Sequence, residues 1–248
     1  MPLNLTVSPD FAPSHISGWF IFNTWMQRQL GEGIHLELYD SFDAQREDIK
    51  AGKYDLVYAN PFDASMLVRD LGFKALVRPL AKADETIIAT NADSSIRSVE
   101  DLDPGCQLYT TDDPDVNRIA MIMLEAADLD ESNTQSHTVD SYVIVARNIL
   151  KGSADAGFFL KDAYDELSDL IRSQMRVLIT SEISVVHHTF LVGPKLQERA
   201  EEIQKFLIAM SNDAKGKSVL DSMGLQGFEE MTEEETEFMI DLIDTLID

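Results

Sequence analysis

Strand-like and helix-like segments alternate along almost the whole of this 248-residue chain. The elements expected in its first third are strands at 3–7, 34–39, 56–59 and 73–77, and helices at 16–30, up to Lys50, and at 61–71. Apolar residues alternate or run continuously in the strands and recur every three or four positions in the helices. Two parallel strands are joined by a crossover of about a dozen residues or more, which is usually a helix. The alternation of strands and helices therefore indicates a mainly parallel sheet covered by helices. We therefore predict an α/β fold.

An internal similarity at an offset of 100 residues indicates that the chain carries one unit twice. The matched positions are Asp40-Ser41-Phe42 with Asp140-Ser141-Tyr142, Ile49 with Ile149, Gly52 with Gly152, and Asp55 with Asp155. Each copy predicts a strand end, an Asp-Ser helix cap, a short helix, a glycine stop and a second buried strand. A chance match at a fitted offset is the alternative explanation.

The repeat and the connectors predict two lobes. An acidic, Ser- and Asp-rich connector lies at 91–95, and strong strand patterns return from residue 175 onward. We expect a second lobe at 89–183, inserted into a first lobe that is built from 1–88 and 184–248. The two chain segments that cross between the lobes would form a hinge.

The last third of the chain continues the same pattern. Strands are expected at 175–180 and 185–192, and a helix at 194–210. Thr232 precedes Glu235 by three residues, which predicts a capping box at the start of a C-terminal helix.

The charge balance excludes several classes of protein. With 44 Asp and Glu against 20 Lys and Arg, the formal net charge is −24. Nucleic-acid binding requires a basic face, and because no cluster of Lys and Arg occurs, we expect no nucleic-acid partner. The hydrophobic share of 44% suffices for a core. No stretch approaches the roughly 20 apolar residues that cross a membrane, so we expect no membrane insertion. We also expect a monomer.

The start of the chain bears on the compartment. A secretory leader needs a basic start followed by an apolar run of about 7–15 residues, and the sequence from Met1 has neither. We expect a cytoplasmic protein if Met1 is the native start. If a leader has been removed, we expect a periplasmic or other extracytoplasmic protein.

Cysteine and histidine predict neither a metal nor a cofactor. The single cysteine, Cys106, excludes an internal disulfide and any CxxC site, and its acidic surroundings favour a buried apolar role over a reactive thiol. His187 and His188 are adjacent, and neighbouring residues in a strand point to opposite faces, so the pair cannot grip one metal ion. We expect His188 to face a ligand, with a structural role as the alternative.

Polar and aromatic residues gather where the predicted strands end. Ligands of open α/β sheets bind beyond the carboxyl ends of the strands, where helix N-termini accept anions even in an acidic protein. Hydroxyls, amides and rings suit a small polar or anionic ligand. The candidate ligand residues at these positions are Asp10, Phe11, Ser41, Tyr58, Asn60, Thr110, Thr111, Ser141, Tyr142 and Phe159.

Each candidate also has a structural alternative. Asp, Ser, Thr and Asn at strand-to-helix junctions cap helices, and Tyr58 and Phe159 suit the core equally well. Arg118 lies in the first turns of a predicted helix, where a basic residue opposes the helix dipole. A bound anion explains Arg118, and surface pairing with Asp112 or Asp115 explains it as well.

Motifs of catalysis are absent from the sequence. It contains no GxSxG, HExxH, P-loop or GxGxxG motif, and no acid and base pair is evident. We therefore expect a binding protein and not an enzyme.

Four segments in sequence order resemble the PhnD-like phosphate, phosphite and phosphonate solute-binding proteins. These segments are Ala51–Pro61, Ser98–Leu102, Lys151–Gly157 and Met223–Phe228. The resemblance covers nearly the whole chain. It implies the type II periplasmic-binding-protein fold, with two lobes that are each a mainly parallel sheet flanked by helices. Two crossover hinge strands would join the lobes, which would clamp a ligand between them.

One departure from that family concerns its oxyanion loop. Family members that bind phosphonates carry Ser-Thr-Ser-Gly where the helix after the first strand of the second lobe begins, and the corresponding stretch here is Asp113–Ile119. The resemblance places Asn117 and Arg118 in this altered loop, Tyr58 to Asn60 in the first-lobe aromatic element, and Ser141-Tyr142 near the second-lobe contact helix. The resemblance therefore carries over the fold more securely than the ligand.

Three functions follow as hypotheses. The first is a solute-binding protein that captures a small polar or anionic ligand, of the phosphonate or phosphate oxyanion class, for an ABC transporter and its permease. The alternative is a ligand-sensing module that signals to a partner such as a sensor kinase, which a chain without a leader favours. An enzyme that uses the same cleft is the third.

Overall fold

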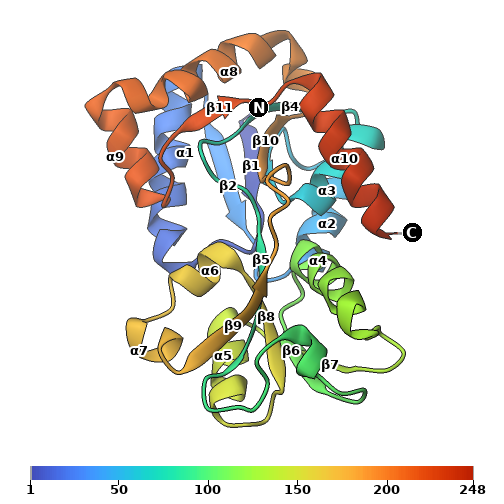
Figure 1. Cartoon of the computed structure of the whole chain (residues 1–248). Coiled ribbons are helices and arrows are strands. Elements are labelled where there is room, and N and C mark those ends of the chain that lie inside the picture. The colour runs from blue at the N-terminus through green and yellow to red at the C-terminus, as the bar shows by residue number, and fades with distance from the viewer. Residues whose placement is uncertain (1, 248) are drawn as a thin grey trace. The chain divides into compact units, whose positions relative to one another are not determined.

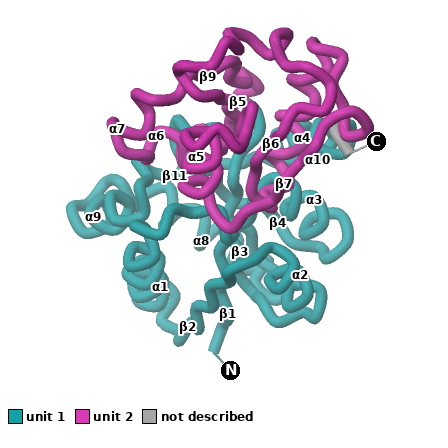
Figure 2. The backbone as a smooth tube through the Cα atoms, turned by 90° about the horizontal axis from the view of Figure 1, so that it is seen from below, with its two compact units in different colours: residues 1–83, 185–245 teal, residues 84–184, 246–248 magenta. Residues whose placement is uncertain are grey.

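The computed structural model describes residues 2–247, and the side chains of residues 2–245. The chain divides into two compact units, shown in different colours in Figure 2. Unit 1 comprises Met1–Ala83 and Val185–Thr245, and unit 2 comprises Asp84–Ser184 and Leu246–Asp248. Residues 84–184 of unit 2 are thus inserted into unit 1 through two connections, at 83/84 and 184/185.

Unit 1 contains a six-stranded sheet in the order β11-β4-β10-β3-β1-β2 (Figure 1). Its strands are β1 (Leu3–Val7), β2 (Ile34–Leu38), β3 (Leu56–Ala59), β4 (Lys74–Pro79), β10 (Thr189–Val192) and β11 (Phe228–Glu230). Its helices are α1 (Ile16–Leu30), α2 (Phe42–Lys50), α3 (Pro61–Arg69), α8 (Ala200–Ile208), α9 (Ala214–Ser222) and α10 (Glu233–Ile247). Strands β1, β2 and β3 are parallel, whereas β10 runs antiparallel between β3 and β4.

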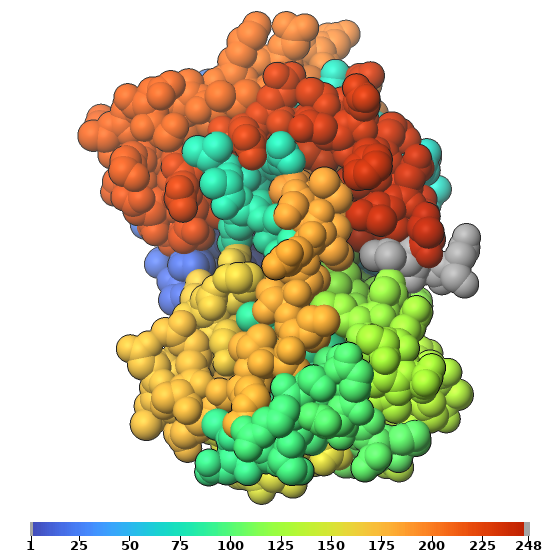
Figure 3. Space-filling model, viewed as in Figure 1, coloured from blue at the N-terminus to red at the C-terminus, as the bar shows by residue number. Residues whose placement is uncertain are grey.

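Alternate residues of these strands face two separate cores, as expected for a sheet that is covered on both sides. Leu56 and Tyr58 face a core that includes α1, α8 and α9, whereas Val57 and Ala59 face a core that includes α2, α3 and α10. Figure 3 shows α8, α9 and α10, in orange to red, on the outer surface of unit 1. A Cβ on Gly18 would lie 2.1 Å from the carbonyl oxygen of Ser222, so only glycine lets α1 approach the end of α9 this closely.

Unit 2 contains a five-stranded sheet in the order β7-β6-β8-β5-β9. Its strands are β5 (Thr86–Asn91), β6 (Gln107–Thr110), β7 (Gln135–Thr138), β8 (Ala156–Leu160) and β9 (Met175–Thr180). Its helices are α4 (Pro114–Leu124), α5 (Tyr142–Leu150), α6 (Lys161–Asp165) and α7 (Asp169–Arg172). Residues 84–88 belong with unit 2 because β5 pairs with β8 and β9.

The repeated unit that the sequence predicts is present at both positions. In unit 1, β1 lies between β2 and β3, and in unit 2, β6 lies between β7 and β8, with parallel pairing in each case. The equivalent helices α2 and α5 each contain nine residues. Gly52 and Gly152 follow them with φ of 72°, a left-handed conformation that glycine adopts without steric cost.

Several local predictions are confirmed and others need correction. Thr232 and Glu235 form the predicted capping box, and Cys106 is buried. Burial raises the pKa of the Cys106 thiol, which disfavours the reactive thiolate. The strand predicted at 185–192 begins only at Thr189, and the helix predicted from Pro194 starts with a 3-10 segment before α8. Helices α6, α7 and α9 were not predicted, and α6 and α7 contain only five and four residues.

Candidate functional site

Three chain segments meet at the end of the unit 1 sheet where β1 and β3 stop. Strands β1 and β3 are parallel and end together, and the N–H of Ser8 donates to the carbonyl oxygen of Tyr58 at 2.8 Å. Because β10 is antiparallel to β3, it begins at this end of the sheet, where Thr189 pairs with Ala59. Asp10, Tyr58, Asn60 and His188 are therefore brought to the same end of the sheet.

Asp10 and His188 form a buried hydrogen-bonded pair. His188 Nε2 lies 2.9 Å from Asp10 Oδ2, and the two side chains are only 10% and 5% exposed. Burial of the Asp10 carboxyl alone would raise its pKa. The positive charge of His188 and the hydrogen bonds from His188 and Ser8 outweigh burial, so the pKa of Asp10 lies below its usual value. The carboxylate thus remains ionised and orients the imidazole ring.

A row of aromatic rings continues from this pair. The His188 ring stacks on Tyr58 with centroids 5.2 Å apart, and Tyr58 lies 4.8 Å from Trp19. Phe11 contacts the other side of the cluster, 6.4 Å from Trp19. Phe11, Tyr58 and His188 were predicted as ligand residues, whereas Trp19 was not, because nothing in the sequence separates it from the other apolar residues of its helix.

Asn60 has a structural role at the start of α3. Its side-chain oxygen accepts the N–H of Asp63 at 2.7 Å, and its amide nitrogen donates to Asp63 Oδ2 and to Ser8 Oγ at 3.1 and 3.3 Å. The sequence signal was available, because an asparagine followed three residues later by an acidic residue predicts a helix cap.

Arg46 completes this network and was missed from the sequence. Its guanidinium binds both carboxylate oxygens of Asp63, at 2.5 and 3.3 Å, and lies over the rings of Phe42 and Phe62. Burial nevertheless raises the pKa of Asp63 above its usual value, although Arg46 and Asn60 oppose that shift. The guanidinium of Arg46 thus binds the Asp63 carboxylate and packs on two aromatic rings, those of Phe42 and Phe62.

Thr110, Thr111 and Asn117 lie together at the equivalent edge of the unit 2 sheet. The Thr110 hydroxyl donates to Asn117 Oδ1 at 2.5 Å, and the Asn117 amide nitrogen donates to the carbonyl oxygen of Thr111 at 2.9 Å. These bonds hold the end of β6 against the first turn of α4.

Asp113 occupies the N-terminus of α4 with its own carboxylate. Oδ1 accepts the N–H of Val116 at 3.2 Å, and Oδ2 accepts the hydroxyl of Tyr142 at 2.8 Å. The Tyr142 ring lies 6.0 Å from the ring of Phe159, which is fully buried in the core of unit 2. A negative charge therefore already fills the end of α4 that the family resemblance links to an oxyanion.

The two serines of the repeat differ in how they cap their helices. The Ser41 hydroxyl accepts the N–H of Ala44 at 3.3 Å at the start of α2. Within residues 2–247, no backbone N–H of α5 donates to the hydroxyl of Ser141. The first turn of α5 also contains no acidic residue. Helix α5 therefore presents its N-terminus without an anion of its own.

Arg118 is exposed on α4 and lies beside a hollow of about 440 Å³ in unit 2. The hollow is lined by Asp112, Pro114, Asn117, Arg118, Met121, Ile122, Glu125, Leu129, Asp130 and Glu131. Four of the ten lining residues are acidic. Arg118 thus lies among carboxylates on the surface of α4.

Neither a cluster of metal-ligating residues nor a membrane-spanning helix is found among the described residues. The part of the chain that the structure describes contains no group of three or more His, Cys, Asp or Glu residues able to hold a metal ion. No helix among residues 2–247 combines the length and the apolar composition needed to cross a lipid bilayer.

Solved structures of several binding proteins share the fold. PhnD1 from Prochlorococcus marinus, in complex with methylphosphonate, gives a TM-score of 0.83 at 13% identity, covering 98% of this chain and 97% of that chain. XAC2383 from Xanthomonas citri, bound to chloride, gives 0.79 at 15% identity, covering 99% and 98%. The periplasmic aliphatic sulphonate-binding protein SsuA from Escherichia coli gives 0.69 at 15% identity, covering 98% and 87%.

The TM-scores show that the fold is shared in spite of these low identities. The predicted type II periplasmic-binding-protein fold is confirmed. A search of curated proteins found no match. The sequence itself matches the family described as "ABC transporter, phosphonate, periplasmic substrate-binding protein" over residues 5–236. The chain therefore belongs to the periplasmic substrate-binding proteins of phosphonate ABC transporters.

Proposed function

We propose that this chain is a non-enzymatic receptor that captures a small oxyanion of the phosphonate or phosphate class and delivers it to an ABC permease outside the cytoplasm. The observation that carries the proposal is the N-terminus of α5. Its backbone N–H groups and the hydroxyl of Ser141 are available to an anion, since the helix has no acidic residue in its first turn. The family match favours transport over the sensing hypothesis.

The two helix ends of unit 2 have different roles in this proposal. The carboxylate of Asp113 already accepts an N–H group of α4, so a second anion there would meet repulsion. We therefore assign the oxyanion to α5. Thr110, Thr111 and Asn117 support that assignment indirectly, because they hold α4 and its acidic N-terminus in place.

Unit 1 by itself also carries groups suited to a small anion with an organic part. The ionised carboxylate of Asp10 orients the imidazole ring of His188. Tyr58 and Phe11 offer apolar surface to the organic group of a phosphonate.

A thermal-shift screen tests this function. Methylphosphonate, phosphite, phosphate, sulfate and methanesulfonate are added separately at millimolar concentrations, with sodium chloride as the control for ionic strength. We expect at least one oxyanion to raise Tm, because a ligand that binds only the native state stabilises it by RT ln(1 + [L]/Kd). The bound oxyanion should be recovered chemically unchanged. Unchanged Tm with all five anions would contradict the proposal, and turnover of the ligand would contradict its non-enzymatic part.

A further inference from the structure

The carboxylate of Asp113 links two helices within unit 2. Asp113 immediately precedes α4 and is only 2% exposed. Its Oδ1 atom accepts the N–H of Val116 in the first turn of α4 at 3.2 Å, and its Oδ2 atom accepts the hydroxyl of Tyr142 at 2.8 Å. Tyr142 is the first residue of α5. One buried carboxylate therefore contacts the first turns of both α4 and α5.

The path from this carboxylate to the proposed oxyanion site is short. One tyrosine side chain and one hydrogen bond separate Asp113 from the backbone of the first turn of α5, a span on the order of 10 Å, or one Debye length. Because the Asp113 carboxylate is buried, solvent ions screen its charge less than the charge of an exposed residue. An anion held at the N-terminus of α5 is therefore subject to the negative charge of Asp113.

The surroundings of Asp113 favour its ionised form. Both of its printed contacts use the carboxylate as an acceptor, and a carboxylate at a helix N-terminus is stabilised by the helix dipole. Asp140, which directly precedes Ser141, is exposed, so water and salt screen its charge. The charge of Asp113 thus acts on the α5 N-terminus from a protected position.

We propose that Asp113 is a specificity-determining residue, whose charge shifts the oxyanion site at α5 away from dianions and toward monoanions. This inference rests on the proposed function and adds to it a preference for ligand charge. Coulomb energy is proportional to the product of the two charges. Repulsion from Asp113 is therefore twice as large for the dianion sulfate as for the monoanion methanesulfonate.

Asp113→Asn removes the charge and retains the shape of the side chain. Asparagine caps helices as well as aspartate does, its oxygen can accept the N–H of Val116, and its amide nitrogen can donate to the hydroxyl of Tyr142. The five anions of the thermal-shift screen are titrated by calorimetry, at neutral pH and low salt, into the wild-type chain and the variant.

The expected result is tighter binding in Asp113→Asn, by an amount that grows with ligand charge. Kd of methanesulfonate should fall about fivefold and Kd of sulfate about twenty-five-fold, because the change in free energy doubles with the charge and the ratio is squared. Phosphate, phosphite and methylphosphonate are mixtures of monoanion and dianion near neutral pH, so they should give intermediate gains. Unchanged or weaker binding in the variant, or equal gains for sulfate and methanesulfonate, would overturn the inference.

The sign of the effect separates it from damage to the fold. A destabilised or misfolded variant binds anions more weakly, whereas removal of a repulsive charge strengthens binding. A purely structural Asp113, which only caps α4 and holds Tyr142, would give Asp113→Asn a lower Tm or no change, with no gain in affinity.

Asp93→Asn and Asp140→Asn are the matched controls. Asp93 is exposed in the connector after β5, and its loss should leave every Kd unchanged. Asp140 is exposed, so its loss should change Kd less than Asp113→Asn does. A charge-dependent gain of equal size in Asp140→Asn would take the assignment away from Asp113. Failure of the wild type to bind any of the five anions would overturn the proposed function and this inference with it, whereas binding without a gain in Asp113→Asn would overturn this inference alone.

Discussion

Asp10 Oδ2 lies 2.9 Å from His188 Nε2, although 178 residues separate the two in sequence. The contact exists because β10 enters the sheet of unit 1 next to β3 and in the opposite direction. His188, which immediately precedes β10, therefore reaches the loop that follows β1. An ionised carboxylate next to the ring sets its orientation.

Asp10→Asn is expected to destabilise unit 1. Loss of one partner of a buried charged pair costs about 3 kcal/mol, and the Asp10 side chain is 5% exposed. The pKa of Asp10 is lowered from 3.8 in the folded chain, so its contribution is present above pH 3.8 and is lost as pH falls through the folded pKa. Urea denaturation at pH 7 and below pH 3.8 should therefore show a difference between wild type and variant that shrinks with acidity.

Asp40→Asn serves as the control for that measurement, since Asp40 is exposed at the edge of the same unit. It should leave the free energy of unfolding nearly unchanged at both pH values. A difference between wild type and Asp10→Asn that persisted unchanged in acid would argue against an ionised Asp10 as the source of stability.

Ser141→Ala and Ser41→Ala should have opposite effects. Ser41 caps α2, so its loss is expected to cost about 1 kcal/mol of stability without changing anion affinity. Ser141 makes no such bond to the described backbone of α5, so its loss should leave Tm nearly unchanged and raise Kd about tenfold. Thermal denaturation and calorimetric titration of both variants measure the contrast. Equal behaviour of the two serines would remove Ser141 from the binding site.

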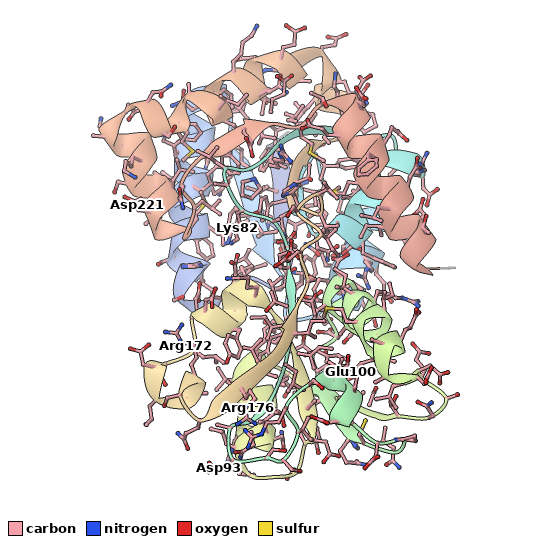
Figure 4. The ribbon with its side chains drawn as sticks, viewed as in Figure 1. Lys82, Asp93, Glu100, Arg172, Arg176 and Asp221 are labelled. Atoms are coloured by element: carbon pink, nitrogen blue, oxygen red, sulfur yellow. The ribbon has the colours of Figure 1, made fainter. Side chains whose placement is uncertain are left out.

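Arg176→Lys should destabilise unit 2. The guanidinium donates to the carbonyl oxygens of Ala92, Ser94 and Ile96, and Figure 4 shows the Arg176 side chain near the labelled Asp93 of this connector. A lysine cannot reproduce the planar fork, so we expect a loss of about 1–2 kcal/mol.

The control for that prediction is Arg172→Lys. Arg172 pairs with Asp169 at a spacing of three residues on α7, and lysine retains this surface pair. Hydrogen exchange of the 91–96 backbone should accelerate in Arg176→Lys only. Acceleration of similar size in both variants would point to a general effect of arginine loss.

Arg118→Ala tests whether an exposed arginine assists the oxyanion from the surface of α4. We expect a several-fold weaker affinity at low salt that disappears at high salt, because exposed charges act at a distance and are screened. Arg97→Ala removes an exposed charge elsewhere in unit 2 and should leave Kd unaltered. Calorimetric titrations at two salt concentrations make the comparison. Salt-independent, wild-type affinity of Arg118→Ala would leave Arg118 as a surface residue only.

Local structural features of this protein could be predicted from its sequence. The strand and helix periods, the capping box at Thr232, the serine cap at Ser41 and the repeated glycine stops all depend on residues a few positions apart. Interactions over such short distances are largely independent of the rest of the fold. The α/β class and the repeated unit of a strand, a short helix and a second strand followed from them.

Tertiary structure alone decided which polar groups became partners. Asp10 finds His188, and Arg46 finds Asp63, only because the strand order and the antiparallel entry of β10 bring distant segments together. The different fates of Ser41 and Ser141 likewise arise from packing. A sequence states what each side chain can donate or accept. Which of those capacities is used in the folded chain is set by close packing of residues far apart in the sequence.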